Sequence, residues 1–257
     1  MKVIILAGGL GSRLGRITEL IPKPMVEVAG KPLLWHIMKI YSHYGFNEFV
    51  VALGYKANYI KDYFLKLNSY NSDITIDTAT GNVVNHNTNH DDWKITLVDT
   101  GESTLKGARI KMLEKYLDED VNMLTYGDGV SDIDLKELVK YHKNHKKTIT
   151  ISGVKPPSRF GELIENNGEV LSFEEKPQSS KGLINGGFMV FNKNLLNYLT
   201  TDKDCDFEFG PLEELAKSGE VMTYKHNGFW ECADTIRDVN HLNKKWSEGE
   251  AKWKVWK

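Results

Sequence analysis

The sequence predicts an α/β fold in which a mostly parallel, Rossmann-like central sheet is flanked by helices and carries an added antiparallel hairpin. The first observation is the run of bulky apolar residues at positions 3–6, which is typical of a strand buried on both faces. The second is the alternation of such runs with segments of helical periodicity. The third is a change after residue 152, where two short extended runs surround a turn at Gly168.

The later elements follow from the same patterns. Residues 25–28 have the pattern of a short extended segment, and Pro32 suits the first turn of a helix whose apolar positions recur until Gly45. The other expected strands lie at residues 49–53, 93–98, 122–126, 148–152, 162–164, 170–173, 189–191 and 221–224, and the other helices at residues 58–67, 133–145, 212–218 and 236–248. Because the carboxyl ends of parallel strands meet at one edge of a sheet, we expect a ligand site at that edge.

Residues 68–93 are polar and turn-rich, with brief strand patterns at residues 74–76 and 83–84. We expect a mobile or intersubunit loop here. The segment contains four side chains that could bind metals, but they lack the spacing of a zinc site: His86, His90, Asp91 and Asp92. His36 lies on a predicted helix without a partner carboxylate, so we interpret it as a structural histidine.

A glycine-rich turn follows the first strand. Gly8, Gly9 and Gly11 remove three Cβ atoms within four positions, which lets backbone N–H groups approach a bulky anion. Arg13 and Lys23 add positive charge to the same region. The spacing matches neither a dinucleotide-binding GxGxxG turn nor a P-loop. The stretch therefore suggests a site for a nucleoside triphosphate, although glycines alone could also form a simple tight turn.

Two acidic residues are candidates for binding a hard cation. Asp128 lies between two glycines at the carboxyl end of a predicted strand, which leaves space around its carboxylate. An Asx-type turn is the alternative interpretation of an Asp-Gly pair. Asp234, far away in the sequence, is the second candidate.

The motifs together resemble the signature of the sugar-1-phosphate nucleotidyltransferases. LAGGLGSRL and Pro22-Lys23-Pro24 are followed in family order by TYGDG, RFG, EEKP, NGGF and FWECADT. The resemblance covers essentially the whole chain and is strongest to the glucose-1-phosphate cytidylyltransferases. It implies the nucleotide-diphospho-sugar transferase fold and the transfer of a cytidylyl group from CTP to glucose 1-phosphate, with release of pyrophosphate. In the relatives, the CDP-glucose product feeds dideoxyhexose synthesis for bacterial surface polysaccharide (O-antigen and lipopolysaccharide).

The resemblance also implies roles for individual residues. The expected catalytic residues are Arg13, Lys23 and Asp128. The expected nucleotide-binding residues are Leu6, Ala7, Gly8, Gly9, Gly11, Ser12, Arg13, Lys23, Thr104, Arg109, Gly127 and Asp128. The expected sugar-phosphate-binding residues are Gly161, Glu175, Lys176, Asn185 and Gly186, and the expected Mg²⁺ ligands are Asp128 and Asp234. Alternatively, Glu175 and Lys176, which precede Pro177, could lie at the solvated end of a strand.

Arg109 is the candidate for reading the base. Cytosine presents acceptors at O2 and N3, and a guanidinium has only donors to offer them. A surface position on an amphipathic helix is the alternative for this arginine.

Two other functions stay open. Because the base is assigned from Arg109 alone, a uridylyl- or thymidylyltransferase is the second interpretation. A regulatory subunit that binds nucleotide sugars without turnover is the third, and the retention of two acidic residues and several basic ones argues against it.

Composition narrows the remaining possibilities. With 257 residues, of which 40% are hydrophobic, the chain is expected to form a single domain, with a nucleotide-binding part (1–152), a sugar-binding part (153–235) and a carboxyl-terminal helix and tail (236–257). The net charge of −2 argues against nucleic acid as a partner. Cys205 and Cys232 are too few for a disulfide framework. We expect a cytoplasmic homo-oligomer, with a hexamer as one form, and no membrane association.

Overall fold

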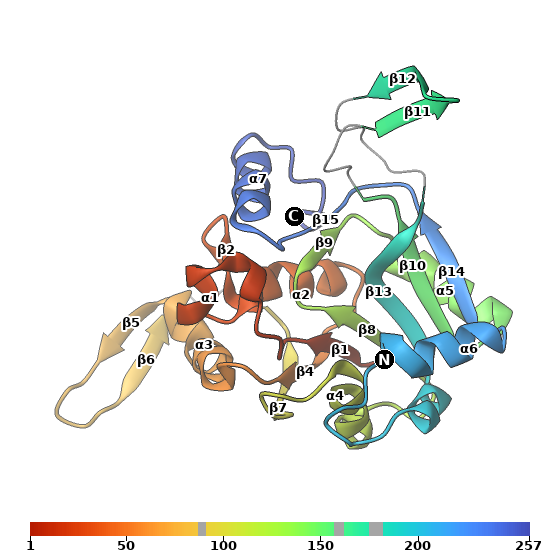
Figure 1. Cartoon of the computed structure of the whole chain (residues 1–257). Helices are drawn as coiled ribbons and strands as arrows, with labels where there is room; N and C mark the ends of the chain where they lie inside the picture. Colours follow the sequence, from red (N-terminus) through yellow and green to blue (C-terminus); the bar gives the residue numbers. More distant parts are fainter. Residues whose placement is uncertain (87–90, 157–161, 175–181) are drawn as a thin grey trace.

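A seven-stranded sheet forms the centre of the computed structural model, which describes residues 1–86, 91–156, 162–174 and 182–257 (Figure 1). The strand order is β14-β10-β13-β8-β1-β4-β7. The bounds are β1 (Val3–Leu6), β4 (Glu48–Leu53), β7 (Lys94–Asp99), β8 (Val121–Tyr126), β10 (Ile149–Val154), β13 (Ile184–Asn192) and β14 (Val221–His226). β13 runs antiparallel to both of its neighbours, and every other pair in this sheet is parallel. The prediction of a mostly parallel sheet is therefore confirmed.

Helices pack on both faces of this sheet. Their bounds are α1 (Arg16–Leu20), α2 (Leu33–His43), α3 (Ala57–Tyr70), α4 (Lys106–Met112), α5 (Leu135–His145), α6 (Glu213–Lys217) and α7 (Ile236–Ser247). Short helical turns are η1 (Ser12–Leu14), η2 (Lys23–Met25), η3 (Glu114–Tyr116), η4 (Lys193–Tyr198) and η5 (Glu208–Leu212). Within the described ranges, no helix combines the length and apolar character needed to cross a bilayer.

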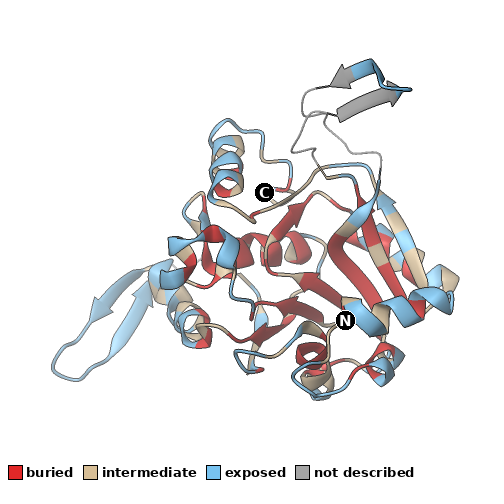
Figure 2. Ribbon diagram, viewed as in Figure 1, coloured by how far each residue is buried: buried red, intermediate tan, exposed pale blue. Residues whose placement is uncertain are grey.

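Alternation along β1 explains why two hydrophobic cores form. Successive side chains of a strand point to opposite faces of the sheet. Val3 and Ile5 belong to one buried cluster together with residues of α2, and Ile4 and Leu6 belong to a second cluster with residues of α4. Figure 2 shows these buried residues concentrated in the central sheet and in the helices against it. An apolar run without alternation is therefore required at this position.

Among the described residues, four two-stranded sheets accompany the central one. They are β2 (Glu27–Val28) with β3 (Lys31–Pro32), β5 (Asp73–Ile76) with β6 (Val83–His86), β9 (Gly129–Ser131) with β15 (Trp230–Cys232), and β11 (Glu162–Asn166) with β12 (Glu169–Glu174). The expected hairpin at β11–β12 is confirmed. The brief strand patterns expected at residues 74–76 and 83–84 are confirmed, because these residues pair as β5–β6 across a turn in which Gly81 has a φ of 75°.

The carboxyl-terminal tail packs against α2. Trp253 is fully buried, and its indole N–H donates to Nδ1 of His36 at 3.4 Å. Nε2 of His36 lies 2.8 Å from the carbonyl oxygen of Val28, so this nitrogen carries the proton of a neutral imidazole. Burial lowers the pKa of His36 to about 4. These contacts agree with a structural role for His36 and a packing role for the tail.

Candidate active site

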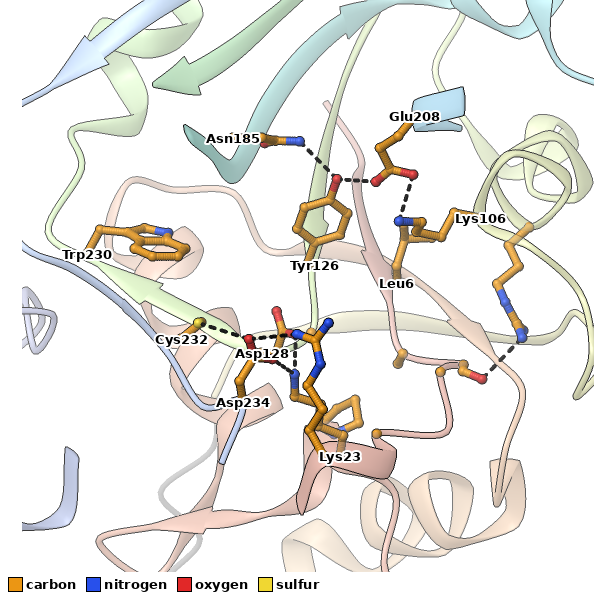
Figure 3. A pocket seen from close by; sticks show the side chains of 18 residues that line it. Leu6, Lys23, Lys106, Tyr126, Asp128, Asn185, Glu208, Trp230, Cys232 and Asp234 are labelled. Carbon is orange, nitrogen blue, oxygen red and sulfur yellow. Dashed lines mark hydrogen bonds and ion pairs between the residues drawn. The ribbon is translucent and has the colours of Figure 1, made fainter. Parts of the chain in front are cut away.

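A cavity of about 520 Å³ lies at the carboxyl ends of β1 and β8, where the sequence predicts a ligand site (Figure 3). β13 enters the sheet beside β8 at the same edge, because it runs in the opposite direction. The cavity is lined by Leu6, Ala7, Gly8, Gly9, Gly11, Arg13, Lys23, Pro24, Lys106, Arg109, Tyr126, Gly127, Asp128, Asn185, Glu208, Trp230, Cys232 and Asp234.

Lys23 bridges two carboxylates at one end of the cavity. Its Nζ lies 2.6 Å from Oδ2 of Asp128 and 2.5 Å from Oδ1 of Asp234. Arg13 contacts the second oxygen of Asp234 at 3.3 Å. The acids meet because β9 pairs with β15, and the N–H of Ala233 donates to the carbonyl oxygen of Asp128 at 2.9 Å. The predicted meeting of Asp128 and Asp234 across one cavity is therefore observed.

The charges of this group balance one another. Two cations, Arg13 and Lys23, face two anions, Asp128 and Asp234, so their formal sum is zero. Burial alone would lower the pKa of Lys23, but the adjacent carboxylates outweigh it and raise that pKa. Burial alone would likewise raise the pKa of Asp234, and the contacts with Lys23 outweigh it and lower that pKa. Lys23 and Asp234 are thus both charged at neutral pH.

Arg109 donates hydrogen bonds to the backbone of the glycine-rich turn and of the neighbouring loops. Its side chain is buried, and its two terminal nitrogens donate to five oxygens at 2.7–3.1 Å: the carbonyls of Gly8, Leu53, Gly101 and Glu102 and the hydroxyl of Thr100. A Cβ at Gly8 would overlap the guanidinium. The glycine at this position therefore permits the approach of Arg109, in addition to any ligand.

A second polar group lies at the other end of the cavity. The hydroxyl of Tyr126 donates to Oε1 of Glu208 at 2.6 Å and accepts a hydrogen bond from Nδ2 of Asn185 at 3.0 Å. Lys106 contacts Oε2 of the same carboxylate at 2.6 Å. The indole N–H of Trp230 donates to the carbonyl oxygen of Gly186 at 2.7 Å. Figure 3 shows this group separated from Lys23 by the breadth of the cavity.

Comparison with known proteins identifies the family. A sequence profile described as nucleotidyl transferase matches residues 2–246. The chain belongs to the nucleotidyl transferase family.

Relatives of this nucleotidyl transferase include enzymes with named substrates. The chain is 44% identical to glucose-1-phosphate cytidylyltransferase of Salmonella typhimurium over 257 residues, covering 100% of both chains. It is 43% identical to a probable glucose-1-phosphate cytidylyltransferase of Bacillus subtilis over 256 residues, again with full coverage of both. Among solved structures, HddC from Yersinia pseudotuberculosis superposes with a TM-score of 0.71 at 26% identity, covering 95% of this chain and 99% of that one.

Several predicted site residues of the nucleotidyl transferase do not line the cavity or lie outside the described residues. Ser12, Thr104 and Gly186 are not among the cavity-lining residues, although the carbonyl of Gly186 orients Trp230. Gly161, Glu175 and Lys176 lie outside the residues that the structure describes.

Other lining residues were not predicted from the sequence. Tyr126 and Cys232 belong to the motifs TYGDG and FWECADT, so membership of these motifs was a usable signal. Trp230 lies in the FWECADT motif without an assigned role. Lys106 and Glu208 belong to no motif. They reach the cavity because backbone contacts bring residues 203–208 against α4.

The two acids are the candidates for holding a metal in this nucleotidyl transferase. In the part of the chain that the structure describes, no group of three or more His, Cys, Asp or Glu side chains could hold a metal ion by itself. Two carboxylates nevertheless fit Mg²⁺, which commonly takes one or two protein carboxylates and completes its octahedron with phosphate oxygens and water. The ammonium of Lys23 between the same carboxylates shows that the pair accommodates a cation.

Proposed function

We propose that this nucleotidyl transferase is a glucose-1-phosphate cytidylyltransferase, which makes CDP-glucose and pyrophosphate from CTP and α-D-glucose 1-phosphate. The main support is the 44% identity over the full chain to the Salmonella typhimurium enzyme of that name. The cavity adds chemical support, because one end of it brings Lys23, two aspartates and a glycine-rich turn together.

The reaction requires a phosphate oxygen of glucose 1-phosphate to attack the α-phosphorus of CTP, after which pyrophosphate leaves. The nucleophile is already an anion at neutral pH, so no general base is needed. The main obstacle is the repulsion between two anionic substrates, together with the charge that develops during in-line transfer. Lys23 and Arg13 line the cavity and can place positive charge on these phosphates. Lys23 would exchange one of its carboxylate partners for phosphate.

Asp128 and Asp234 are the residues that would hold Mg²⁺. When bound, the ion neutralises phosphate charge and aligns the phosphates. The chain itself contributes the spacing of the two carboxylates, which the β9–β15 pairing fixes, and the positive charge of Lys23 between them. Because the four charges of Arg13, Lys23, Asp128 and Asp234 sum to zero without a ligand, two added positive charges would complement an incoming triphosphate.

The proposal divides the cavity into two ends. The glycine-rich turn, with Lys23 and Asp128, would bind the nucleotide at one end, and Asn185 would bind the sugar phosphate at the other. The roles of Gly161, Glu175 and Lys176 in that end stay predictions from the family resemblance. A contact between Arg109 and the base also stays a prediction, since the guanidinium would have to give up part of its five hydrogen bonds.

The proposal is tested by pyrophosphate release with glucose 1-phosphate and each of CTP, UTP, dTTP and ATP, with and without Mg²⁺. We expect turnover with CTP that depends on Mg²⁺. Turnover mainly with UTP or dTTP would replace the cytidylyltransferase with a relative of different base specificity. Binding of CDP-glucose without pyrophosphate release from any pair would indicate a regulatory subunit.

Two further expectations belong to the proposal. Cys205 and Cys232 are free thiols, which suits a reducing compartment, and we propose that the enzyme acts in the cytoplasm. The homo-oligomer, with a hexamer as one form, stays a prediction. Sedimentation velocity would distinguish a monomer of 29.2 kDa from a hexamer without ambiguity.

A further inference from the structure

Four side chains at the far end of the cavity from Lys23 form one connected group, the Glu208 network: Lys106, Tyr126, Asn185 and Glu208. All four line the cavity, and they come from α4, β8, β13 and η5. Glu208 is at the centre, because one of its carboxylate oxygens contacts Tyr126 and the other contacts Lys106. Figure 3 shows Tyr126 standing between Asn185 and Glu208.

The direction of each hydrogen bond in the Glu208 network is fixed. Burial, followed by the charge of Glu208, raises the pKa of Tyr126 above its usual range, so the phenol keeps its proton and donates it to the carboxylate. The phenol oxygen is then left to accept from Nδ2 of Asn185. Oδ1 of Asn185 accepts from the backbone N–H of Gly187 at 2.9 Å. With both ends of the amide engaged, Asn185 has one orientation.

Glu208 is itself held rigidly. Oδ1 of Asp206 accepts from the N–H of Glu208 at 2.8 Å and from that of Phe209 at 3.2 Å. The preceding residues lie directly on α4, since the N–H groups of Leu105 and Ala108 donate to the carbonyls of Lys203 and Cys205. A Cβ at Gly107 would lie only 2.5 Å from the carbonyl oxygen of Asp206. The carboxylate of Glu208 therefore serves as a fixed acceptor.

We propose that Glu208 is a positioning residue of the sugar-phosphate end: acting through the hydroxyl of Tyr126, it fixes the side-chain amide of Asn185 for contact with the hexose hydroxyls. An amide that is free to rotate exchanges its donor and acceptor and has to be ordered when the sugar binds. A preorganised amide avoids that cost. The inference rests on the proposed role of Asn185 in binding the sugar phosphate.

The test compares Michaelis constants in the pyrophosphate-release assay. Glu208→Ala and Tyr126→Phe should each raise the KM for glucose 1-phosphate about tenfold, the effect of losing one good hydrogen bond to a charged group. The KM for CTP should change by less than about twofold. Glu208→Gln should recover most of the loss, because its amide oxygen can still accept from Tyr126. Glu119→Ala is the matched control, since that carboxylate pairs with Lys193 at 2.6 Å on the surface, away from the cavity.

A double mutant separates positioning from an independent effect. If Glu208 acts through Asn185, Asn185→Ala with Glu208→Ala should raise the KM for glucose 1-phosphate no further than Asn185→Ala alone. Additive effects would overturn the inference. So would unchanged KM values in Glu208→Ala and Tyr126→Phe, an effect on the KM for CTP instead, or a failure of Glu208→Gln to recover.

Controls keep the inference distinct from the proposed function. If Asn185→Ala leaves the KM for glucose 1-phosphate unchanged, the sugar role of Asn185 fails, and the inference fails with it. If Asn185→Ala raises that KM but Tyr126→Phe does not, only the inference fails. Should Glu208→Ala not fold, as judged by circular dichroism, Tyr126→Phe decides the question. The Kd of CDP-glucose, measured by calorimetry, should rise in the same variants that raise the KM for glucose 1-phosphate. This measurement is a test that is independent of turnover.

Discussion

At the scale of single residues, Lys23 joins two carboxylates that would otherwise repel each other across the cavity. Lys23→Met keeps much of the side-chain stem and removes the charge that would meet the phosphates. We expect kcat to fall by about 10²–10³, as when one donor to a developing anion is removed. Pyrophosphate release measures this loss.

The control for Lys23→Met is Lys193→Met, which removes a lysine that pairs with a carboxylate on the surface, away from the cavity. This variant should keep the activity of the unmodified enzyme. Circular dichroism should show both variants folded. A kcat for Lys23→Met within about threefold of that of the unmodified enzyme would contradict the assigned role.

His36 gives the molecule a pH dependence of stability. An unfolded histidine titrates near pH 6.5, whereas burial lowers the pKa of folded His36 to about 4. The unfolded state therefore binds more protons between these values, and the free energy of unfolding falls as the pH decreases from about 6.5 to about 4. This direction is the one expected for a base that is buried in its neutral form. We expect a loss of about 2 kcal/mol from this residue between pH 7 and pH 5.

Urea unfolding at pH 7 and pH 5 measures this dependence. His142 and His145 also have pKa values lowered by burial, so they contribute with the same sign. His36→Gln can still donate to the carbonyl of Val28, and it should reduce the difference between the two pH values by about 2 kcal/mol. An unchanged difference would show that His36 does not titrate as its burial implies.

At the scale of elements, the β5–β6 hairpin stands apart from the rest of the molecule. It projects from the body beyond α3 (Figure 1), and every residue of its two strands is exposed. Two-stranded hairpins without a packed face add little stability. Replacing residues 73–86 with a short Gly-Ser linker should therefore change the free energy of unfolding by less than about 1 kcal/mol.

Urea unfolding of this deletion variant, compared with the full chain at equal protein concentration, checks the expectation. Trp253→Ala is an informative reference, because it removes a fully buried indole and should cost about 3–5 kcal/mol. A hairpin deletion as costly as Trp253→Ala would mean that the exposed strands are covered in solution.

Local periodicity explains which elements were predictable. The strand at β1 and the helices α2 and α5 have patterns that are set by burial on known faces, so sequence alone locates them. The β9–β15 pair joins residues about 100 positions apart in three-residue strands, and no local pattern specifies such a pairing. η5 could not be predicted from the sequence either, because it is an irregular turn that contains Gly210, at a φ of 98°, and Pro211.

At the scale of the whole molecule, the proposed nucleotide and sugar parts share one continuous sheet. β13, from the second part, hydrogen-bonds directly to β8, from the first. We therefore expect one cooperative unfolding transition in calorimetry, and a rise in its midpoint with CDP-glucose. At 100 times the Kd the ligand should add about 2.7 kcal/mol to the free energy of unfolding. Two separate transitions would contradict a single domain.

The cavity was predictable where a motif carries its residues and unpredictable where tertiary packing carries them. The glycine-rich turn, Lys23, Asp128 and Asp234 were identified from their types and spacing, and they do line one cavity. The environment of Arg109 could not be predicted, because the atoms that accept its hydrogen bonds are mostly backbone carbonyls, which have no signature in the sequence. Lys106 and Glu208 were missed for a related reason, since only the folded chain brings them together.

The start of α7 links the chemistry to the end of the chain. Thr235 caps this helix, and its neighbour Asp234 reaches into the cavity. The helix then leads into the segment that buries Trp253 against α2. One helix, α7, thus joins the cavity carboxylate Asp234 to the tail that packs on α2. We expect loosening of this tail to displace Asp234 before it disturbs the sheet, so that activity is lost on heating below the midpoint of unfolding.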